Sequence, residues 1–304
     1  MVNMKIELAD VKFENPIMTA SGTYGYGDEY EDLYPPSKLG AVSSKGLTLN
    51  KKDGNPPPRI YETPSGILNS IGLANMGIDS FIQQKCPELK EKNIKVIANI
   101  AGKSFEEFGI MAEKCSEIEI IKAIEVNVSC PNVKKGGMAF GVDFDNIYKI
   151  TKIVKEVTDK PVVIKLSPNV TDITEMADAA VSAGADGLTL INTLLGMAID
   201  IEKGFPVMSN KVAGLSGPAI KPVGIRMVYQ VREKFPDTFI FGVGGISCFN
   251  DILEYMMAGA NAVQIGTSLF SDPMLPYRSI EKLENYLKKN NYKNINDIVG
   301  CALN

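Results

Sequence analysis

The segment PVVIKLSPNVTDITEMADAAVSAGADGLTLI, residues 161–191, contains two short apolar runs separated by one amphipathic stretch. The runs at 161–165 and 187–191 have the composition of strands, whereas the stretch at 171–183 has the apolar spacing of a helix. Gly184 ends that stretch, as glycine commonly does at the end of a helix. This order predicts two parallel strands joined by a crossover helix.

The same alternation recurs along all 304 residues. Eight apolar runs are predicted strands: Ile17–Ala20, Ala41–Lys45, Val96–Ile100, Ala123–Asn127, Pro161–Lys165, Gly187–Ile191, Phe239–Val243 and Ala262–Ile265. Six stretches are predicted helices: Ile78–Glu91, Phe105–Ser116, Asp145–Thr158, Thr171–Ala183, Pro218–Phe235 and Cys248–Ala258. Eight such units favour an α/β fold, a (β/α)8 TIM barrel forming a single domain over residues 1–304. A doubly wound open sheet is the main alternative.

Two segments depart from this alternation. Residues Lys51–Gly77 form a long connection after the second strand, which we expect to be an insertion of functional importance. Residues Met1–Asp10 alternate like a strand and lack the apolar core of a signal peptide. The weakly charged run 177–199 is interrupted by polar residues and glycines, so we predict helix, turn and strand there and no membrane span.

Composition excludes several classes of function. The net charge is −4 and the basic residues are scattered, so nothing favours nucleic acid or a membrane surface as a partner. The five cysteines are odd in number and widely spaced, which argues against a disulfide framework and against a metal or iron–sulfur site. Reduced thiols indicate a cytoplasmic protein.

Polar residues and glycines follow the predicted strands where each strand ends. Active sites of such barrels lie at the carboxyl ends of the strands, so these residues would share one face. Two lysines there imply a ligand that is or becomes negative, because an unpaired strand-end lysine is costly. Glycine pairs after the last two strands match the common phosphate site, formed by backbone N–H groups and a helix N-terminus. The residues are Ser21, Gly22, Lys45, Gly46, Asn99, Asn127, Lys165, Ile191, Asn192, Thr193, Gly244, Gly245, Gly266 and Thr267. A phosphate tail and a head that needs amide edges and positive charge describe flavin mononucleotide (FMN).

Cys130 lies just past the fourth predicted strand, in a chain without histidine. Histidine is the usual proton carrier near neutral pH, so another group must move protons, and a thiol is a credible one. Simpler interpretations exist: Gly244-Gly245 as a turn, Lys45 and Lys165 as surface residues, Cys130 as an inert thiol. All of these residues lie at the same relative position in successive strand units, which favours the functional interpretation. The other four cysteines are expected to be structural.

The sequence Asn127-Val-Ser-Cys-Pro-Asn-Val-Lys-Lys-Gly-Gly137 resembles the catalytic segment of the class 1 dihydroorotate dehydrogenases. The similarity covers nearly the whole chain, and six further motifs carry it. They are Asn15-Pro-Ile-x-x-Ala-Ser-Gly22, Gly54-Asn-Pro-x-Pro-Arg59, Leu68-Asn-Ser-Ile-Gly-Leu73, Lys165-Leu-Ser-Pro-Asn169, Ile191-Asn-Thr-Leu-Leu-Gly-Met197 and Gly214-Leu-Ser-Gly-Pro-Ala-Ile-Lys-Pro222. Together these motifs are highly specific.

The resemblance implies an FMN-binding barrel that oxidises dihydroorotate to orotate in pyrimidine biosynthesis. Cys130, on a mobile loop after the fourth strand, would take the C5 proton, while the C6 hydride passes to flavin N5. A thiol is mostly protonated at neutral pH, so flavin reduction should rise with pH until Cys130 ionises. The FMN positions implied are Ser21, Lys45, Gly46, Asn99, Asn127, Lys165, Ile191, Gly217, Gly244, Gly245, Gly266 and Thr267. The substrate positions implied are Lys45, Asn69, Ser70, Ile71, Gly72, Leu73, Asn127, Asn132, Asn192 and Thr193. No metal site is expected.

Within class 1, Val133-Lys-Lys-Gly-Gly137 resembles the 1B type. This implies a catalytic subunit, expected as a homodimer joined in a heterotetramer to a subunit with FAD and a [2Fe–2S] cluster, and NAD as the acceptor. The chain has no cysteine cluster and no dinucleotide motif, so electrons would leave through that partner. Alternatives are the 1A type, which uses fumarate without a partner, another flavin barrel, a purine-nucleotide dehydrogenase barrel, and a non-catalytic flavin- or phosphate-binding barrel.

Overall fold

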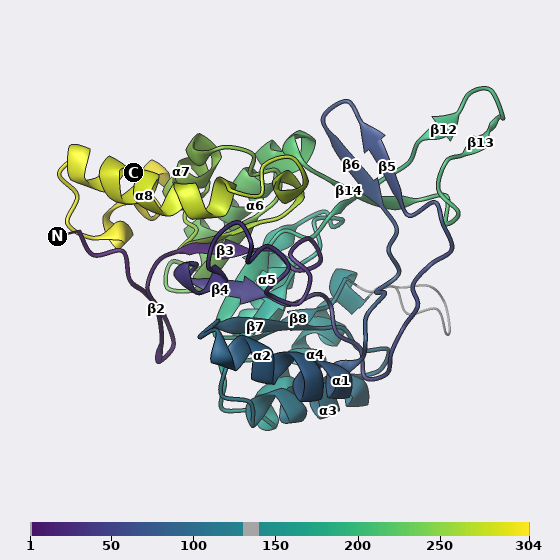
Figure 1. Cartoon of the computed structure of the whole chain (residues 1–304), viewed down its shortest axis with the longest axis horizontal. Helices are drawn as coiled ribbons and strands as arrows, with labels where there is room; N and C mark the ends of the chain where they lie inside the picture. The colour runs from purple at the N-terminus through teal and green to yellow at the C-terminus, as the bar shows by residue number, and fades with distance from the viewer. Residues whose placement is uncertain (1, 130–139, 304) are drawn as a thin grey trace.

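Eight parallel strands close into a barrel in a computed structural model that describes residues 2–129 and 140–303 (Figure 1). The predicted (β/α)8 fold is confirmed, and the open-sheet alternative is wrong. Neighbouring strands follow one another in chain order around the barrel. The strands are β3 (Ile17–Thr19), β4 (Ala41–Ser43), β7 (Val96–Ile100), β8 (Ile121–Asn127), β9 (Val162–Lys165), β10 (Gly187–Leu190), β15 (Phe239–Val243) and β16 (Ala262–Ile265).

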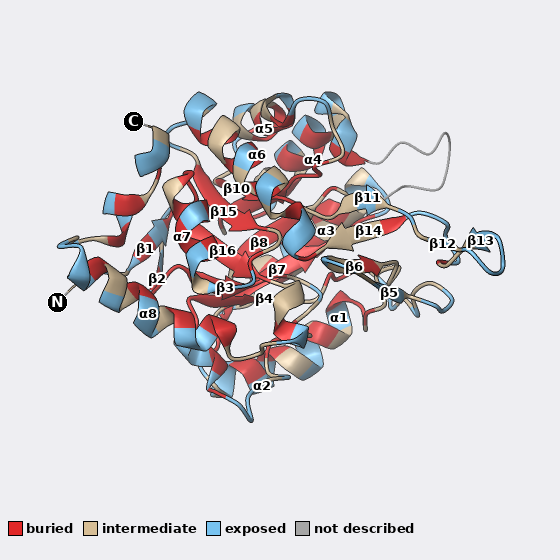
Figure 2. Ribbon diagram, turned by 90° about the horizontal axis from the view of Figure 1, so that it is seen from above, coloured by how far each residue is buried: buried red, intermediate tan, exposed pale blue. Residues whose placement is uncertain are grey.

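Figure 2 shows the barrel strands as buried, with helices around them. The helices cover the outside of such a barrel, and side chains of the strands fill its inside. Every residue of β7 and of β15 is buried. Such strands are continuous apolar runs, which is why composition alone located all eight.

The helices follow the strands as the amphipathic stretches predicted. They are α1 (Ile78–Ser80), the π-helical turn η2 (Phe81–Lys85), α2 (Cys86–Glu91), α3 (Phe105–Ser116), α4 (Phe144–Glu156), α5 (Ile173–Ser182), α6 (Lys221–Lys234), α7 (Phe249–Met257) and α8 (Leu275–Lys289). The predicted starts at Ile78 and Phe105 are exact, and the other four lie one to three residues from the observed starts of α4, α5, α6 and α7. Asp143 caps α4 and Asp172 caps α5, each by accepting a backbone N–H in the first turn. Helix α8 was not predicted.

Short 3-10 turns complete the helical layer: η1 (Pro36–Lys38), η3 (Phe140–Val142), η4 (Pro218–Ile220), η5 (Thr267–Phe270), η6 (Ile295–Ile298) and η7 (Cys301–Leu303). Segment 177–199 contains the end of α5, the turn at Gly184 and β10, as predicted. Among the described helices none has the length and apolar character needed to cross a membrane.

A hairpin of β1 (Ile6–Leu8) and β2 (Val11–Phe13) lies at the amino ends of the strands. Leu8 and Phe13 are fully buried. A Cβ atom on Gly187, at the start of β10, would lie 3.3 Å from Leu8 Cδ1. The strand expected in Met1–Asp10 is therefore β1, and the hairpin packs against the end of the barrel opposite the expected active site.

A four-stranded antiparallel sheet extends from the other end (Figure 1). The insertion predicted after the second barrel strand supplies β5 (Ile60–Thr63) and β6 (Gly66–Asn69). The connection after β10 supplies β11 (Leu194–Gly196) and β14 (Ala213–Ser216), with a hairpin of β12 (Ile199–Asp200) and β13 (Phe205–Pro206) between them. This second contribution was not predicted. The loop predicted after β8 falls on residues 130–139, which lie outside the described residues.

Candidate active site

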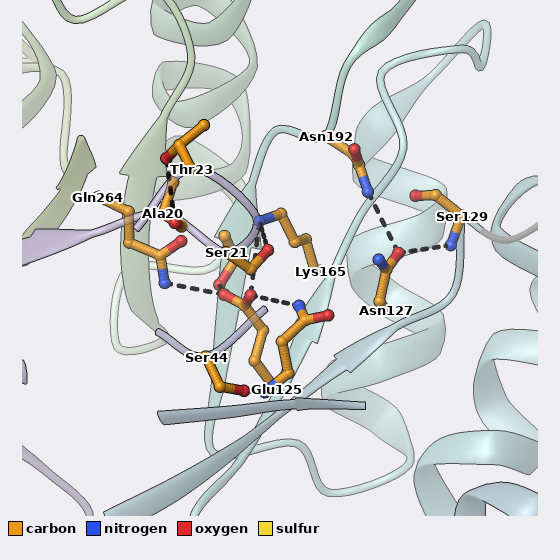
Figure 3. Close-up of polar contacts among 12 residues, drawn as sticks. Ala20, Ser21, Thr23, Ser44, Glu125, Asn127, Ser129, Lys165, Asn192 and Gln264 are labelled. Atoms are coloured by element: carbon orange, nitrogen blue, oxygen red, sulfur yellow. Dashed lines mark hydrogen bonds and ion pairs between the residues drawn. The ribbon is translucent and has the colours of Figure 1, made fainter. Parts of the chain in front are cut away.

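A carboxylate lies inside the barrel, near the carboxyl ends of its strands. Glu125 on β8 is fully buried. Its Oε1 accepts from Asn99 Nδ2 on β7 at 2.7 Å and lies 3.4 Å from Lys165 Nζ on β9. Its Oε2 accepts from Thr189 Oγ1 on β10 at 2.7 Å and from Gln264 Nε2 on β16 at 2.8 Å. Figure 3 shows the carboxylate of Glu125 between Lys165 and Gln264. The four donors together fix it in one orientation.

Lys165 is buried against this carboxylate. Its Nζ also donates to Ser21 Oγ at 3.2 Å, so two residues predicted to bind FMN meet here. Burial alone raises the pKa of Glu125, but the Lys165 charge and the hydrogen bonds from Gln264, Thr189 and Asn99 outweigh it and hold that pKa below its usual range. The alternative that Lys165 is a surface residue is wrong. Its anionic partner among the described residues is Glu125.

Glu125 was not among the predicted site residues. The available signal was a charged residue within the apolar run Ala123–Asn127. Such a residue is almost never fully buried without partners, and this one has partners on four other strands.

Lys45 and Gly46 follow β4 beside Asn99. Lys45 is half-buried, and its ammonium has no hydrogen bond or ion pair with any described residue. A Cβ atom on Gly46 would lie 3.1 Å from both Asn99 Oδ1 and Leu73 Cδ2. Asn99 Oδ1 is itself buried and lacks a partner in the described part of the chain. The ends of β4 and β7 therefore offer one positive charge and one buried hydrogen-bond acceptor to a ligand.

The side chains of Asn127 and Asn192 form a hydrogen bond at the carboxyl ends of β8 and β10. Asn127 Oδ1 accepts from Asn192 Nδ2 and from Ser129 N, each at 3.2 Å (Figure 3). Asn192 Oδ1 accepts from Thr193 N at 2.8 Å. Three residues predicted to bind substrate are thus brought together.

Asn169, which was not a predicted site residue, holds this group from the loop after β9. Its Nδ2 donates to Thr193 O at 3.1 Å, and its Oδ1 accepts from Leu195 N at 2.8 Å. The motif Lys165-Leu-Ser-Pro-Asn169 contained the residue, but sequence alone gave it no partner.

The predicted substrate segment Asn69–Leu73 lies between the small sheet and the barrel. Asn69 Nδ2 donates to Gly214 O at 3.2 Å, and Ser70 Oγ accepts from Asn55 Nδ2 at 2.9 Å. Ile71 O accepts from Asn55 N at 3.0 Å. Gly72 and Leu73 have φ of 72° and 56°, the left-handed region that favours glycine.

Asn75 anchors this segment to the end of β4. Its Nδ2 donates to Leu73 O at 2.7 Å and to Thr48 Oγ1 at 2.8 Å. Its Oδ1 accepts from Thr48 N at 3.2 Å and from Gly77 N at 2.8 Å. The side chain is buried and fully bonded, so we regard it as a positioning residue that sequence analysis missed.

The predicted FMN residues after β10, β14 and β15 also converge. Gly217, Gly244 and Gly245 have φ of 99°, 125° and 71°. A Cβ atom on Gly245 would lie 2.8 Å from Gly217 O, and one on Gly244 would lie 3.4 Å from Ile191 Cγ1. The approach at Gly245 leaves no room for a side chain, and the positive φ at both residues favours glycine, so these positions are more restricted than an ordinary turn requires.

Gly266 and Thr267 complete the ring after β16. Thr267 Oγ1 donates to Ser216 Oγ at 2.8 Å, and a Cβ atom on Gly266 would lie 3.2 Å from Ala20 Cβ. Within the described residues no hydrogen bond uses the backbone N–H groups of Gly244, Gly245 or Thr267. These groups are available to an anion.

Asp251 holds the backbone just before helix α7. Its Oδ2 accepts from Ser247 N at 2.7 Å and from Cys248 N at 3.0 Å, and its Oδ1 lies 2.7 Å from Lys221 Nζ. These contacts fix the link between the glycine turn after β15 and the first turn of α7.

Cys130 and Asn132 lie outside the described residues. The four described cysteines are free thiols. Burial raises the pKa of Cys86 and that of Cys115 to about 12, so these two thiols are protonated and unreactive. No group of three or more possible metal ligands occurs among residues 2–129 and 140–303.

Comparisons with known proteins agree with this geometry. A family model described as "Dihydroorotate dehydrogenase" matches residues 3–287. The chain belongs to the dihydroorotate dehydrogenase family.

Curated relatives resemble the chain over nearly its full length. One from Geotalea uraniireducens (strain Rf4) is 50% identical over 303 residues, covering 99% of this chain and 98% of the relative. One from Thermoanaerobacter pseudethanolicus is 52% identical over 301 residues, covering 98% of each. One from Desulforamulus reducens is 50% identical over 301 residues, covering 99% of each. Each is named "Dihydroorotate dehydrogenase B (NAD(+)), catalytic subunit".

The residues of this dihydroorotate dehydrogenase family member fit FMN. The unbonded N–H groups of Gly244, Gly245 and Thr267 suit a phosphate. The unpaired ammonium of Lys45 and the unpartnered buried oxygen of Asn99 suit the charge and the polar edge of the flavin ring. The two groups lie on either side of β3 in the barrel, one after β15 and β16 and the other after β4 and β7, so one extended ligand would contact both.

Proposed function

We propose that the chain oxidises dihydroorotate to orotate in pyrimidine biosynthesis, as the catalytic subunit of an NAD-linked dihydroorotate dehydrogenase. Membership of the family carries this proposal. The convergence of lysine, asparagine and glycine residues at one end of the barrel supports it. When bound, FMN supplies the hydride acceptor.

Residues at the strand ends of this chain would bind the cofactor. Gly244, Gly245, Gly266 and Thr267 would bind the FMN phosphate. Lys165 would stabilise the negative charge that builds on the flavin as it is reduced. Ser21, Gly46, Asn99, Ile191 and Gly217 would complete the cofactor site.

Substrate recognition would use amide groups. Orotate has a carboxylate and a cyclic imide edge, and an asparagine offers both a donor and an acceptor to such an edge. Asn69, Asn127 and Asn192 would read that edge, while Lys45 would face the carboxylate. Ser70, Ile71, Gly72, Leu73, Asn132 and Thr193 would complete the substrate site.

Cys130 would remove the C5 proton as the C6 hydride leaves. The product then gains a C5–C6 double bond, and the two electrons leave the chain toward NAD. Cys130 would act as its thiolate, so the rate of flavin reduction should increase with pH until the thiol ionises.

We propose that electrons leave through a partner subunit with FAD and a [2Fe–2S] cluster, in a heterotetramer built on a homodimer of this chain, in the cytoplasm. The relatives' name, "catalytic subunit", supports a separate partner. Exposed apolar side chains on and around the β12–β13 hairpin support the homodimer, because permanent interfaces are more apolar than electron-transfer contacts. This hairpin patch consists of Leu195, Met197, Ile199, Ile201, Phe205 and Val212.

Anaerobic addition of dihydroorotate to the purified, FMN-loaded chain tests the reaction. The yellow absorbance of the flavin should bleach with formation of one orotate per flavin. A flavin that stays oxidised would exclude the proposed function, and so would a chain that binds no FMN. Efficient reduction of NAD by the isolated chain would exclude the partner, and turnover with fumarate alone would favour the 1A type.

A further inference from the structure

Glu125 has no assigned part in the reaction, yet it contacts two residues that the proposed function places at the flavin. The carboxylate bonds Asn99 and Lys165 through the same oxygen, Oε1. Thr189 and Gln264 occupy the other oxygen. The inside of such barrels is ordinarily filled by layers of branched apolar side chains. A buried ion pair is weak support for stability, because apolar side chains of similar volume often serve as well or better. Packing alone therefore does not explain why Glu125 and its polar partners fill this layer of the barrel.

The hydrogen bond from Asn99 determines which way its amide points. A carboxylate can only accept, so Asn99 must turn its NH2 group toward Glu125. Asn99 Oδ1 is then directed elsewhere, beside Gly46, where it is buried and has no described partner. The oxidised flavin ring carries a single N–H donor, on its imide edge. An acceptor held at this place is suited to that donor.

The ion pair determines how much charge Lys165 brings to the site. Lys165 Nζ contacts Glu125 on one side and Ser21 Oγ, a residue at the end of β3, on the other. In a buried site the neighbouring carboxylate offsets part of the lysine charge. Loss of the carboxylate would leave the lysine unneutralised, which favours the more negative, reduced form of a bound flavin.

We propose that Glu125 is a positioning residue that fixes the Asn99 amide with its oxygen toward the flavin and sets the charge of Lys165. The inference rests on the proposed function, because it assigns the flavin to these residues. Glu125 touches neither cofactor nor substrate in this account. It acts through the two residues that do.

The test compares Glu125→Gln with the wild type by FMN titration of the apoprotein and by the midpoint potential of the bound flavin. An amide at position 125 presents an N–H group that needs an acceptor, and Asn99 can provide one only by turning its oxygen away from the flavin. The FMN dissociation constant should rise at least about tenfold, which corresponds to the loss of one hydrogen bond of about 1.4 kcal/mol. The midpoint potential should shift to more positive values. Glu113→Gln, at an exposed position on α3, should change neither quantity.

A variant that fails to fold does not remove the test. Glu125→Gln with Lys165→Met takes away both charges, so no ion is left buried and unpaired. Lys165→Met alone keeps the carboxylate that orients Asn99, so the double variant should still bind FMN about tenfold more weakly than that single variant. The double variant also lacks the unpaired anion of Lys165→Met, a difference that by itself would favour binding of the anionic FMN. Equal affinities in this pair would overturn the orienting role.

The outcomes separate this inference from the function on which it rests. A wild-type chain that binds no FMN overturns both. Bleaching of the wild-type flavin by dihydroorotate supports the function. If Glu125→Gln then keeps the wild-type FMN affinity and midpoint potential and loses only thermal stability of the apoprotein, Glu125 is purely structural and the inference is wrong. A weaker FMN affinity together with a raised potential supports the inference.

Discussion

Asn192 Nδ2 lies 3.2 Å from Asn127 Oδ1, which joins the ends of β8 and β10 across the strand between them, β9. The contact determines how both amides are presented. Asn127 Oδ1 is fully used by Asn192 and Ser129, and within the described residues Asn127 Nδ2 has no partner. The pair therefore offers a donor to the carbonyl and carboxylate oxygens of a ligand such as orotate.

Replacement of Asn127 by aspartate tests this assignment. The side chain keeps its size but exchanges its free donor for a negative charge, which opposes an anionic ligand. We expect the orotate dissociation constant to rise ten- to a hundredfold, from the loss of a hydrogen bond to a charged group worth about 1.5–3 kcal/mol. Perturbation of the flavin absorbance during orotate titration measures this constant. Asn250→Asp, at an exposed position of α7, is the control, and an equal effect there would contradict the prediction.

Asn169 should act on the same ligand without touching it. Asn169→Ala removes the bonds to Thr193 O and Leu195 N, so the Asn192–Thr193 turn loses its anchor. The orotate dissociation constant should rise about fivefold, equivalent to about 1 kcal/mol, while the FMN constant stays unchanged. Asn169→Asp keeps only the acceptor for Leu195 N and should lie between alanine and wild type. A loss of FMN binding of the same size would instead indicate general damage to this end of the barrel.

Gly245 provides a test of the proposed phosphate site. Alanine there must adopt φ of 71°, and its Cβ would lie 2.7 Å from Lys221 N and 2.8 Å from Gly217 O. Gly184 offers a matched control, since its φ is 95° but nothing lies within 4 Å of an added Cβ. Gly184→Ala should lose about 1 kcal/mol of stability through backbone strain, and Gly245→Ala should lose more, because its Cβ also meets backbone atoms. Only Gly245→Ala should also weaken FMN binding, by tenfold or more in a fluorescence titration.

The strand positions were predictable because burial on both faces leaves a simple signal. Each barrel strand is an apolar run, and the residue just past it was assigned to the active-site face without knowledge of its neighbours. The convergence of Ser21 with Lys165 and of Asn127 with Asn192 agrees with that assignment. Periodicity also located α3 at its observed limits, Phe105–Ser116.

Contacts between distant segments could not be predicted from local pattern. Asn169 and Asn75 act by hydrogen bonds to backbone groups of other loops, and nothing in their own neighbourhood indicates those partners. The sheet that pairs β6 with β14 joins residues near 68 to residues near 215. Glu125 was missed for a related reason. Its four donors come from four other strands, and its burial as a charged group depends on all of them.

Asp251 predicts a pH dependence of stability. Burial alone raises the pKa of Asp251, but Lys221 and the hydrogen bonds from Ser247 and Cys248 outweigh it and hold that pKa below its usual range. A lowered folded-state pKa stabilises the protein at pH values above the ordinary pKa, about 3.9, and the stabilisation is lost as pH falls through the folded-state value. Asp251→Asn should therefore lower the free energy of unfolding by about 2 kcal/mol at pH 7.

The difference between Asp251→Asn and the wild type should shrink as the pH falls below the ordinary aspartate pKa of about 3.9 and through the lower folded-state pKa, because both side chains are then neutral. Denaturant unfolding of the apoprotein at several pH values measures it. Glu254→Gln removes the other, more exposed carboxylate that contacts Lys221, at 2.9 Å, and should cost less than about 1 kcal/mol. A difference for Asp251→Asn that does not depend on pH would mean that the side chain contributes through shape and not through charge.

The hairpin patch predicts how the chain assembles. Ile201, just after β12, is 92% exposed and belongs to the six exposed apolar residues of the hairpin patch. A group of exposed apolar side chains marks an interaction surface, whereas a single one does not. Ile201→Asp would place an unpaired charge in an apolar interface, which should weaken the homodimer tenfold or more. Light scattering at micromolar concentration should give a dimer for the wild type and a monomer for the variant. Leu33→Asp, at an exposed apolar residue outside the patch, should remain dimeric.

Because the patch lies on the hairpin and not among the strand-end residues, dihydroorotate should still bleach the flavin of the monomeric variant. A variant that stays dimeric would show that the homodimer uses another face.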